Sequence, residues 1–195
     1  MVALVSSSSG PPEIARDVLV GCKRGDPAAF RAFVTRYQRP VFAVLSRMLG
    51  IGPHVEDLAQ DVFLRAFRAF PEFDIDRSAK PSTWILTIAT RAALDARKRT
   101  VVPTLPIDDA EAQRKAAPGT PETERRRAEL RAAIARAAEE LPDDQRAVFV
   151  LAEFHDRSMA EISEILGVPE NTVKTRLFRA RTKLQERLGA LMEES

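Results

Sequence analysis

Cysteine, histidine and long apolar runs are all nearly absent from this 195-residue sequence. The single cysteine, Cys22, has no partner for an internal disulfide and cannot build a zinc site alone. The histidines, His54 and His155, lie far apart without cysteines or carboxylate clusters at metal-ligand spacing. No apolar run approaches the roughly 20 residues that a membrane span requires, and no charged segment followed by an apolar one marks a signal peptide. These absences indicate a protein of the reducing cytoplasm without a metal site.

Glycine and aromatic residues are also scarce, at 8 glycines and 6% aromatic residues, and strand-forming residues do not cluster. Hydrophobic residues make up 45% of the chain and charged residues 30%, which suits solvated helices that bury apolar faces. This composition predicts an all-α fold. The sequence has no glycine-rich phosphate loop, no paired metal ligands and no plausible catalytic triad. We therefore expect no enzymatic activity, no cofactor and no small-molecule substrate.

The net charge of +2 is too small to indicate a nucleic-acid partner, but the charge is unevenly distributed. Residues 141–170 carry 2 basic and 7 acidic side chains, whereas residues 171–195 carry 6 basic and 3 acidic ones. An acidic block is therefore followed by a basic helix. A surface polarised in this way can face DNA on one side and repel it on the other.

Breaks in the helical pattern divide the chain into two domains. Residues 1–12 are serine-rich and are expected to be disordered. Residues 13–100 have the pattern of a helical bundle. Residues 101–121 contain four prolines and one glycine without sustained periodicity, which is typical of a flexible linker. Residues 122–195 form a second, smaller helical domain.

Helix starts and stops are well marked in the first domain. Asp26 and Pro27 have the N-cap and first-position pattern of a helix that ends at the glycines before Pro53. Pro53 begins another helix, which ends near Pro71 and is followed by a polar loop. The last helix of the domain covers about residues 82–99. The expected inward positions of the Pro53 helix are Val55, Leu58, Ala59, Val62, Phe63, Ala66, Phe67 and Phe70.

The second domain has the pattern of a helix-turn-helix. Ser158 and Glu161 form a capping box at the start of a short helix, because each side chain can bind the other residue's free backbone N–H. The turn covers residues 167–169 and precedes a long basic helix over about 170–190. A helix of this kind can enter the major groove of DNA. The alternative is a helical hairpin whose basic side chains are only solvated. The side chains expected on the outer face of the basic helix are Glu170, Asn171, Lys174, Thr175, Phe178, Arg179 and Arg181.

Four sequence blocks have the order and spacing of a known family. They are GDPAAFRAFVTRYQRPVF (25–42), VEDLAQDVFLRAFRAFPEFD (55–74), PSTWILTIATRAALDARKR (81–99) and AEISEILGVPENTVKTRLFRARTKL (160–184). In these blocks the chain resembles the extracytoplasmic-function (ECF) sigma factors of bacterial RNA polymerase. The linker leaves no room for the intermediate domain that this family lacks and housekeeping sigma factors have. The resemblance implies that residues 13–100 are sigma region 2 and residues 122–195 are sigma region 4.

The resemblance also implies that the helix over residues 54–70 docks on the clamp helices of the polymerase β′ subunit. The residues expected at this interface are Asp57, Gln60, Asp61 and Arg65. Their carboxylates and amide can pair with arginine side chains on a partner helix. The alternative interpretation of this charged stripe is a solvent-exposed helix face that binds no partner. The β flap of core RNA polymerase, promoter DNA and an anti-sigma factor are the other partners that the resemblance implies.

The loop at 71–80 and the helix at 82–99 match the part of the family that melts and reads the −10 promoter element. Melted DNA offers bases for stacking and phosphates for neutralisation. The candidate contact residues are Phe73, Trp84, Arg91, Arg97 and Lys98. A place in the core is the alternative for Trp84. The family usually has Asn-x-x-x-Asp on this helix, whereas Arg91 stands here at the asparagine position and Asp95 is present.

The last helix matches the part of the family that reads the −35 element as duplex DNA. The residues expected to contact it are Glu170, Asn171, Lys174, Thr175, Arg176, Phe178, Arg179 and Arg181, of which Arg176 and Arg181 are expected on phosphates. A conventional helix-turn-helix regulator that does not replace sigma is the alternative function. Such a regulator would use residues 13–100 for sensing or dimerisation, and it would not need the 54–70 helix to bind polymerase.

Overall fold

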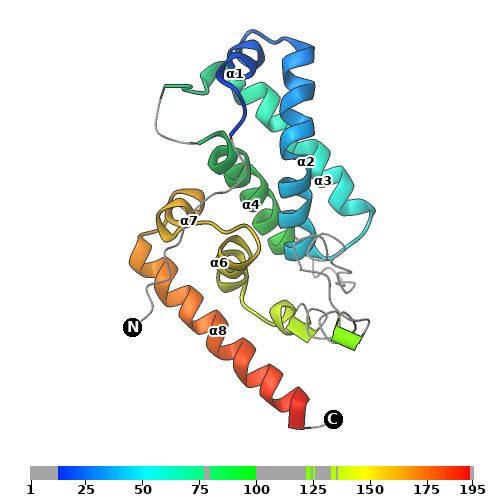
Figure 1. The fold of residues 1–195 in the computed structure, drawn as a ribbon, viewed down its shortest axis with the longest axis vertical. Helices are drawn as coiled ribbons and strands as arrows, with labels where there is room; N and C mark the ends of the chain where they lie inside the picture. The colour runs from blue at the N-terminus through cyan, green and yellow to red at the C-terminus, as the bar shows by residue number, and fades with distance from the viewer. Residues whose placement is uncertain are drawn as a thin grey trace.

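The computed structural model describes residues 13–76, 80–99, 122–123, 125, 133–134 and 136–193, with side chains described to residue 189. These residues form helices joined by short turns, with no strand among them, which confirms the all-α prediction (Figure 1). The expected N-terminal tail, the linker over 101–121 and, within the expected helix over 122–140, residues 124, 126–132 and 135 lie outside the described residues. None of the helices in the described ranges combines the length and the apolar character needed to cross a bilayer.

The first unit of the fold is a helical bundle, two of whose helices begin at Pro27 and Pro53 as the sequence predicts. Its elements are α1 (Arg16–Lys23), α2 (Pro27–Leu49), α3 (Pro53–Ala69), the short 3-10 helix η1 (Phe70–Glu72) and α4 (Pro81–Arg99). Asp26 caps α2 by accepting a hydrogen bond from the backbone N–H of Ala28 at 2.8 Å, and Pro27 takes the first helical position. The helix continues through Pro40 and ends at Gly50, whose φ of 83° favours glycine.

Aromatic side chains fill the centre of this bundle. The rings of Phe33 and Phe70 are fully buried and meet edge to face, with centroids 4.9 Å apart. Trp84 of α4 packs on Phe70 at 5.0 Å and on Phe73 at 4.6 Å, and Phe73 is only 6% exposed. Aromatic pairs at these separations add to the stabilisation that burial gives, so the cluster holds α2, η1 and α4 together.

The second unit contains the helix-turn-helix. Its helices are α6 (Asp143–Glu153), α7 (Met159–Leu166) and α8 (Glu170–Glu193). The capping box forms as predicted: Ser158 Oγ accepts from the Glu161 N–H at 3.2 Å, and Glu161 Oε2 accepts from the Ser158 N–H at 3.0 Å. Gly167 ends α7 in the left-handed conformation, with φ of 66°. The turn places α8 against α7, where Ile165 and Val173 are fully buried.

The two units pack against each other. α7 lies beside α4, and α6 contacts both α2 and α4 (Figure 1). Arg47 of α2 lies over the ring of Phe154, which follows α6, with its guanidinium carbon 4.4 Å from the ring centroid. A cation over an aromatic face is attracted by the ring quadrupole, so this contact supports the junction of α2 with α6.

A buried arginine lies at the centre of the junction between the units. Arg146 of α6 is 1% exposed, and it donates from Nε to the Ala138 carbonyl oxygen at 2.8 Å and from NH1 to the Met48 carbonyl oxygen at 2.9 Å. Arg97 of α4 donates from NH1 to the same Met48 oxygen at 2.9 Å and from Nε to the carboxylate of Asp143. Arginines of α4 and α6 therefore donate to one backbone oxygen of α2.

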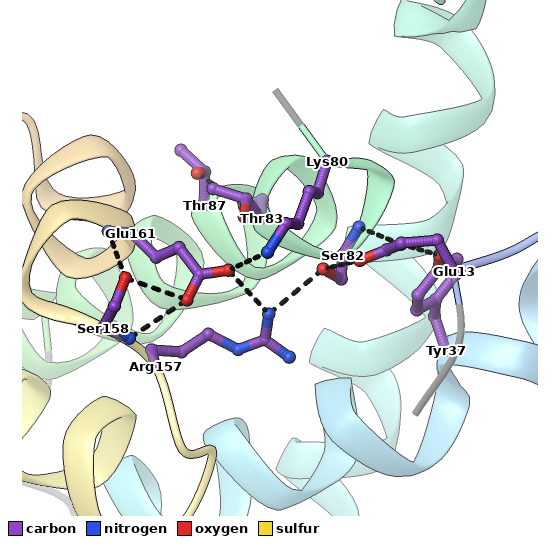
Figure 2. Close-up of polar contacts among 9 residues, drawn as sticks. All are labelled: Glu13, Tyr37, Lys80, Ser82, Thr83, Thr87, Arg157, Ser158 and Glu161. Atoms are coloured by element: carbon purple, nitrogen blue, oxygen red, sulfur yellow. Dashed lines mark hydrogen bonds and ion pairs between the residues drawn. The ribbon is translucent and has the colours of Figure 1, made fainter. Parts of the chain in front are cut away.

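A second group of polar contacts links the start of α4 to α7 (Figure 2). Arg157 donates from NH1 to Ser82 Oγ at 3.1 Å and to Glu161 Oε1 at 3.5 Å, and Lys80 Nζ donates to the same Glu161 oxygen at 2.9 Å. Glu13 accepts hydrogen bonds from the backbone N–H of Ser82, at 3.2 Å, and from its hydroxyl group. The segment before α1, the start of α4 and the start of α7 are thereby connected through side chains.

Candidate DNA and polymerase interfaces

The first turns of α8 present most of the predicted −35 residues to solvent. Val173 is fully buried and Leu177 is 5% exposed, so the apolar face of α8 points into the fold. Lys174 and Arg179 are exposed, and the ring of Phe178 is 71% exposed. The other exposed members of the predicted set are Glu170, Asn171, Thr175 and Arg181. The face combines cations, hydrogen-bonding groups and one apolar ring, all of which can contact base edges or phosphates in a major groove.

The cations of α8 are not equivalent. Arg176 Nε lies 3.0 Å from Asp144 Oδ2, and Arg181 donates from Nε at 3.0 Å and from NH2 at 2.6 Å to Glu153 Oε1. Both carboxylates belong to α6. The other two predicted basic contacts of the helix, at positions 174 and 179, make no ion pair with the described residues. The two α8 arginines predicted to bind phosphates are thus the ones that form ion pairs with α6.

The predicted −10 residues lie in three different environments. Phe73 is buried and Trp84 is half-buried, and both belong to the aromatic centre of the first unit. For Trp84 this placement matches the core alternative. Arg91 and Lys98 are exposed on α4. Arg97 is bound to Asp143 across the junction with α6. The structure does not bring these side chains together into one surface.

The predicted polymerase-docking residues share the exposed side of α3. Asp57, Gln60 and Arg65 are exposed, and Asp61 is half-buried. Arg65 NH2 lies 2.6 Å from Asp61 Oδ2, one helical turn away. The arrangement offers a carboxylate, an amide and a salt-bridged pair to a partner surface.

Two apolar side chains extend this side of α3. Leu64 is 53% exposed, and Phe67 is 42% exposed. The prediction that Phe67 faces inward is wrong, because the buried stripe of α3 centres on Val62 and Ala66 and leaves Phe67 at its edge, where it meets Phe30 edge to face at 4.9 Å. The helical spacing from the polar residues Gln60 and Asp61 would have placed Leu64 on the outer face.

Metal-ligand clusters and the Cys22 thiol are two further kinds of candidate site. Within the described ranges, no three His, Cys, Asp or Glu side chains are grouped so that they could hold a metal ion. Burial, together with the charge of Asp26, raises the pKa of the Cys22 thiol to about 11. At neutral pH this thiol stays protonated and is a poor nucleophile.

Comparison with known proteins identifies the family. The family model described as Sigma-70 region 2 matches residues 33–101, and the one described as Sigma-70, region 4 matches residues 131–184. Over 87% of its length, the chain is 37% identical to ECF RNA polymerase sigma factor SigW of Bacillus subtilis (strain 168), and it covers 94% of that protein. The chain belongs to the ECF family of RNA polymerase sigma factors. It is also 34% identical to the ECF sigma-E factor of Escherichia coli (strain K12), over 87% of this sigma factor and 92% of the relative.

A solved structure has the same arrangement of helices as this sigma factor. It contains CnrH in complex with the cytosolic domain of CnrY, and it matches with a TM-score of 0.67 and 26% sequence identity. The match covers 90% of this sigma factor and 97% of the other chain. Region 2 preceding region 4 on one chain is the order predicted from sequence, and it disfavours the alternative of a conventional helix-turn-helix regulator.

Proposed function

We propose that this sigma factor binds core RNA polymerase and directs it to specific promoters, with region 2 at the −10 element and region 4 at the −35 element. The observation that carries the proposal is the exposure of two different interaction faces on one chain, the charged side of α3 and the basic side of α8. Two modest sites on one chain gain affinity through their effective concentration, and the connection between them restricts the promoter spacing that they tolerate.

In this proposal α3 docks on the clamp helices of the polymerase β′ subunit. Asp57, Gln60, Asp61 and Arg65 supply the polar contacts, because arginine side chains on a partner helix pair well with carboxylates. Leu64, one helical turn from Gln60 and Asp61, is exposed and adds apolar area to the contact. Region 4 makes the second contact of the sigma factor with polymerase, by binding the β flap.

The basic side of α8 supplies the contacts to the −35 duplex. Lys174 and Arg179 reach base edges, and Phe178 packs against an apolar feature of the groove. Asn171 and Thr175 add hydrogen-bonding groups near the start of the helix. Because much of the affinity comes from phosphates, DNA binding is expected to weaken steeply as the salt concentration rises.

Only some of the predicted −10 residues can reach DNA without a rearrangement of the fold. Arg91 and Lys98 are exposed and can reach a melted strand directly. Arg97 can do so only after its contact with Asp143 opens, because the same guanidinium group would bind the DNA. Phe73 and Trp84 would have to leave the aromatic cluster to stack on a base, so we assign the first contacts to the exposed cations.

We also propose that an anti-sigma factor regulates this protein in the cytoplasm, and that the protein itself catalyses no reaction and needs no cofactor. Support comes from the similarity to CnrH, whose solved structure contains the cytosolic domain of CnrY. A partner of that kind would act by covering the α3 side, the α8 side or both.

Run-off transcription with sequencing of the transcript starts tests the proposed function. The purified protein is added to sigma-free bacterial core polymerase on sheared genomic DNA of the source organism. We expect discrete starts that share two upstream elements and that are absent without the protein. No starts, together with no co-elution with core polymerase, would overturn the proposal and leave a conventional DNA-binding regulator as the better explanation.

A further inference from the structure

All three carboxylates of α6 are paired with arginines that we expect to contact promoter DNA. The pairs are Asp143 with Arg97, Asp144 with Arg176, and Glu153 with Arg181. The pairing was not visible in the sequence, where α6 is only the start of an acidic block. One helix of 11 residues therefore occupies predicted DNA-binding groups of both regions.

The two ends of α6 contribute differently to this arrangement. Asp143 and Asp144 are neighbours in its first turn, yet the first reaches α4 of region 2 and the second reaches α8 of region 4. The positive end of the helix dipole favours both carboxylates at these positions. Glu153 lies in the last turn, where one of its oxygens takes two N–H donors of Arg181.

A guanidinium group binds carboxylate and phosphate through the same set of N–H donors. A DNA phosphate approaching Arg181 must therefore share or displace the donors that Glu153 holds at 2.6 and 3.0 Å. The same competition applies to Arg176 and to Arg97. Lys174 and Arg179, which we expect on base edges, have no such competitor among the described residues.

We propose that α6 is an internal competitor of DNA, whose carboxylates occupy the phosphate-binding arginines and hold the affinity for all DNA low, so that stable binding requires the additional base contacts of a promoter. The inference rests on the proposed function. On non-promoter DNA, phosphate contacts supply nearly all of the affinity, so displacement of the α6 carboxylates opposes most of what holds the complex together. On a promoter, the base contacts of Lys174 and Arg179 are added and offset that cost.

The pairs are too exposed for fold stabilisation to be their main effect. Their side chains are between 23% and 58% exposed. Ion pairs with this exposure contribute little to stability because water screens them. Neutral variants of the three carboxylates are therefore expected to fold, which makes the inference testable by substitution.

The test compares two triple variants with the same change in charge. D143N/D144N/E153Q removes the α6 carboxylates, whereas E140Q/E164Q/E186Q removes three exposed carboxylates of the same region that contact none of the predicted DNA-binding arginines. Each protein is assembled with sigma-free core polymerase, and its affinities for sheared non-promoter DNA and for a promoter mapped by run-off transcription are measured separately. The assay is repeated over a range of salt concentrations.

We expect the α6 variant to bind both non-promoter DNA and the promoter about tenfold more tightly than the control variant, because phosphate contacts contribute to both complexes. Each released arginine should steepen the dependence of log K on log salt by about 0.9, and the control variant should not share this change. Equal DNA affinity and equal salt dependence of the two variants would overturn the inference.

A second comparison separates competition from simple repulsion between carboxylates and DNA. E153Q is measured alone and in an R181Q background. Competition predicts that E153Q has little effect once Arg181 is absent, because the two residues then no longer interact. An undiminished effect in that background would contradict the inference. Failure of the proposed function itself would appear separately, as a wild-type protein that forms no holoenzyme with core polymerase.

Discussion

Arg97 of α4 and Arg146 of α6 donate to the same acceptor, the Met48 carbonyl oxygen, at 2.9 Å each. Met48 lies in the last turn of α2, where carbonyl groups have no partner within the helix. Burial, and next the positive charge of Arg97, lowers the pKa of Arg146 to about 10, so the side chain remains charged at neutral pH. A charged donor from region 4 thus completes the end of a region 2 helix.

Arg146→Met is expected to lower the free energy of unfolding by about 2–3 kcal/mol, because the substitution keeps an apolar stem but removes two hydrogen bonds from a charged donor. The Ala138 carbonyl oxygen loses its buried partner, whereas the Met48 oxygen keeps Arg97. Urea denaturation followed by circular dichroism measures the change. Arg136→Met, at an exposed position, is the control and should stay within about 0.5 kcal/mol of wild type. Equal loss in the two variants would argue against the role given to Arg146.

Glu161 should make stability depend on pH in the acid range. Partial burial tends to raise its pKa, but the hydrogen bond from the Ser158 N–H, the hydrogen bond from Lys80 and the charge of Arg157 more than offset this, and the pKa is lowered. A carboxyl group with a lowered folded-state pKa stabilises the fold above its unfolded pKa of about 4.3, and this stabilisation is lost as the pH falls through the folded value.

Glu161→Gln isolates this contribution, because glutamine can still complete the capping box but carries no charge. At pH 7 we expect the variant to be less stable than wild type by at most about 1 kcal/mol, since the partner Lys80 is exposed. The difference should shrink as the pH falls below about 4. Thermal melts of both proteins from pH 7 to pH 3 provide the measurement. A difference that is constant over this range would show that the charge of Glu161 is not the cause.

Local rules explain why much of the fold could be predicted. Asp26 with Pro27, the Ser158–Glu161 box and Gly167 each act through backbone groups within a few residues, so the sequence alone determines what they do. The same holds for the exposed outer face of α8, because its apolar residues recur at helical spacing. The family assignment followed from such local patterns in a fixed order.

Contacts between distant segments could not be predicted in this way. Arg146 and Met48 are separated by 98 residues, and no periodicity connects them. The burial of Phe73 against Trp84 also depends on how η1 meets α4, which a helical pattern does not contain. The partners of Arg97 and Arg176 are set by the packing of α6 between α4 and α8, so residues selected for DNA contact also have partners within the protein.

Asp61→Arg is expected to abolish binding to core polymerase, lowering the affinity on the order of 100-fold or more, because it places a cation where arginines of the partner are expected. Glu72→Arg, an exposed position just after α3, has the same charge change and should bind core polymerase like wild type. Fluorescence anisotropy of labelled sigma factor with sigma-free core measures both affinities. Normal core affinity of the Asp61 variant would remove α3 from the docking assignment.

Lys174→Ala combined with Arg179→Ala should weaken selection of the −35 element while leaving binding to core polymerase unchanged. Each base contact that is lost is worth about 1–3 kcal/mol of discrimination, so the preference for a promoter over a copy with a scrambled −35 element should fall at least about tenfold. Lys183→Ala combined with Arg187→Ala removes the same residue types further along α8 and is the matched control. Competitive run-off transcription on the two templates measures the preference. If both double variants retain the wild-type preference, base recognition must come from a different part of region 4. If both lose it equally, α8 acts through its total charge and not through side chains at defined positions.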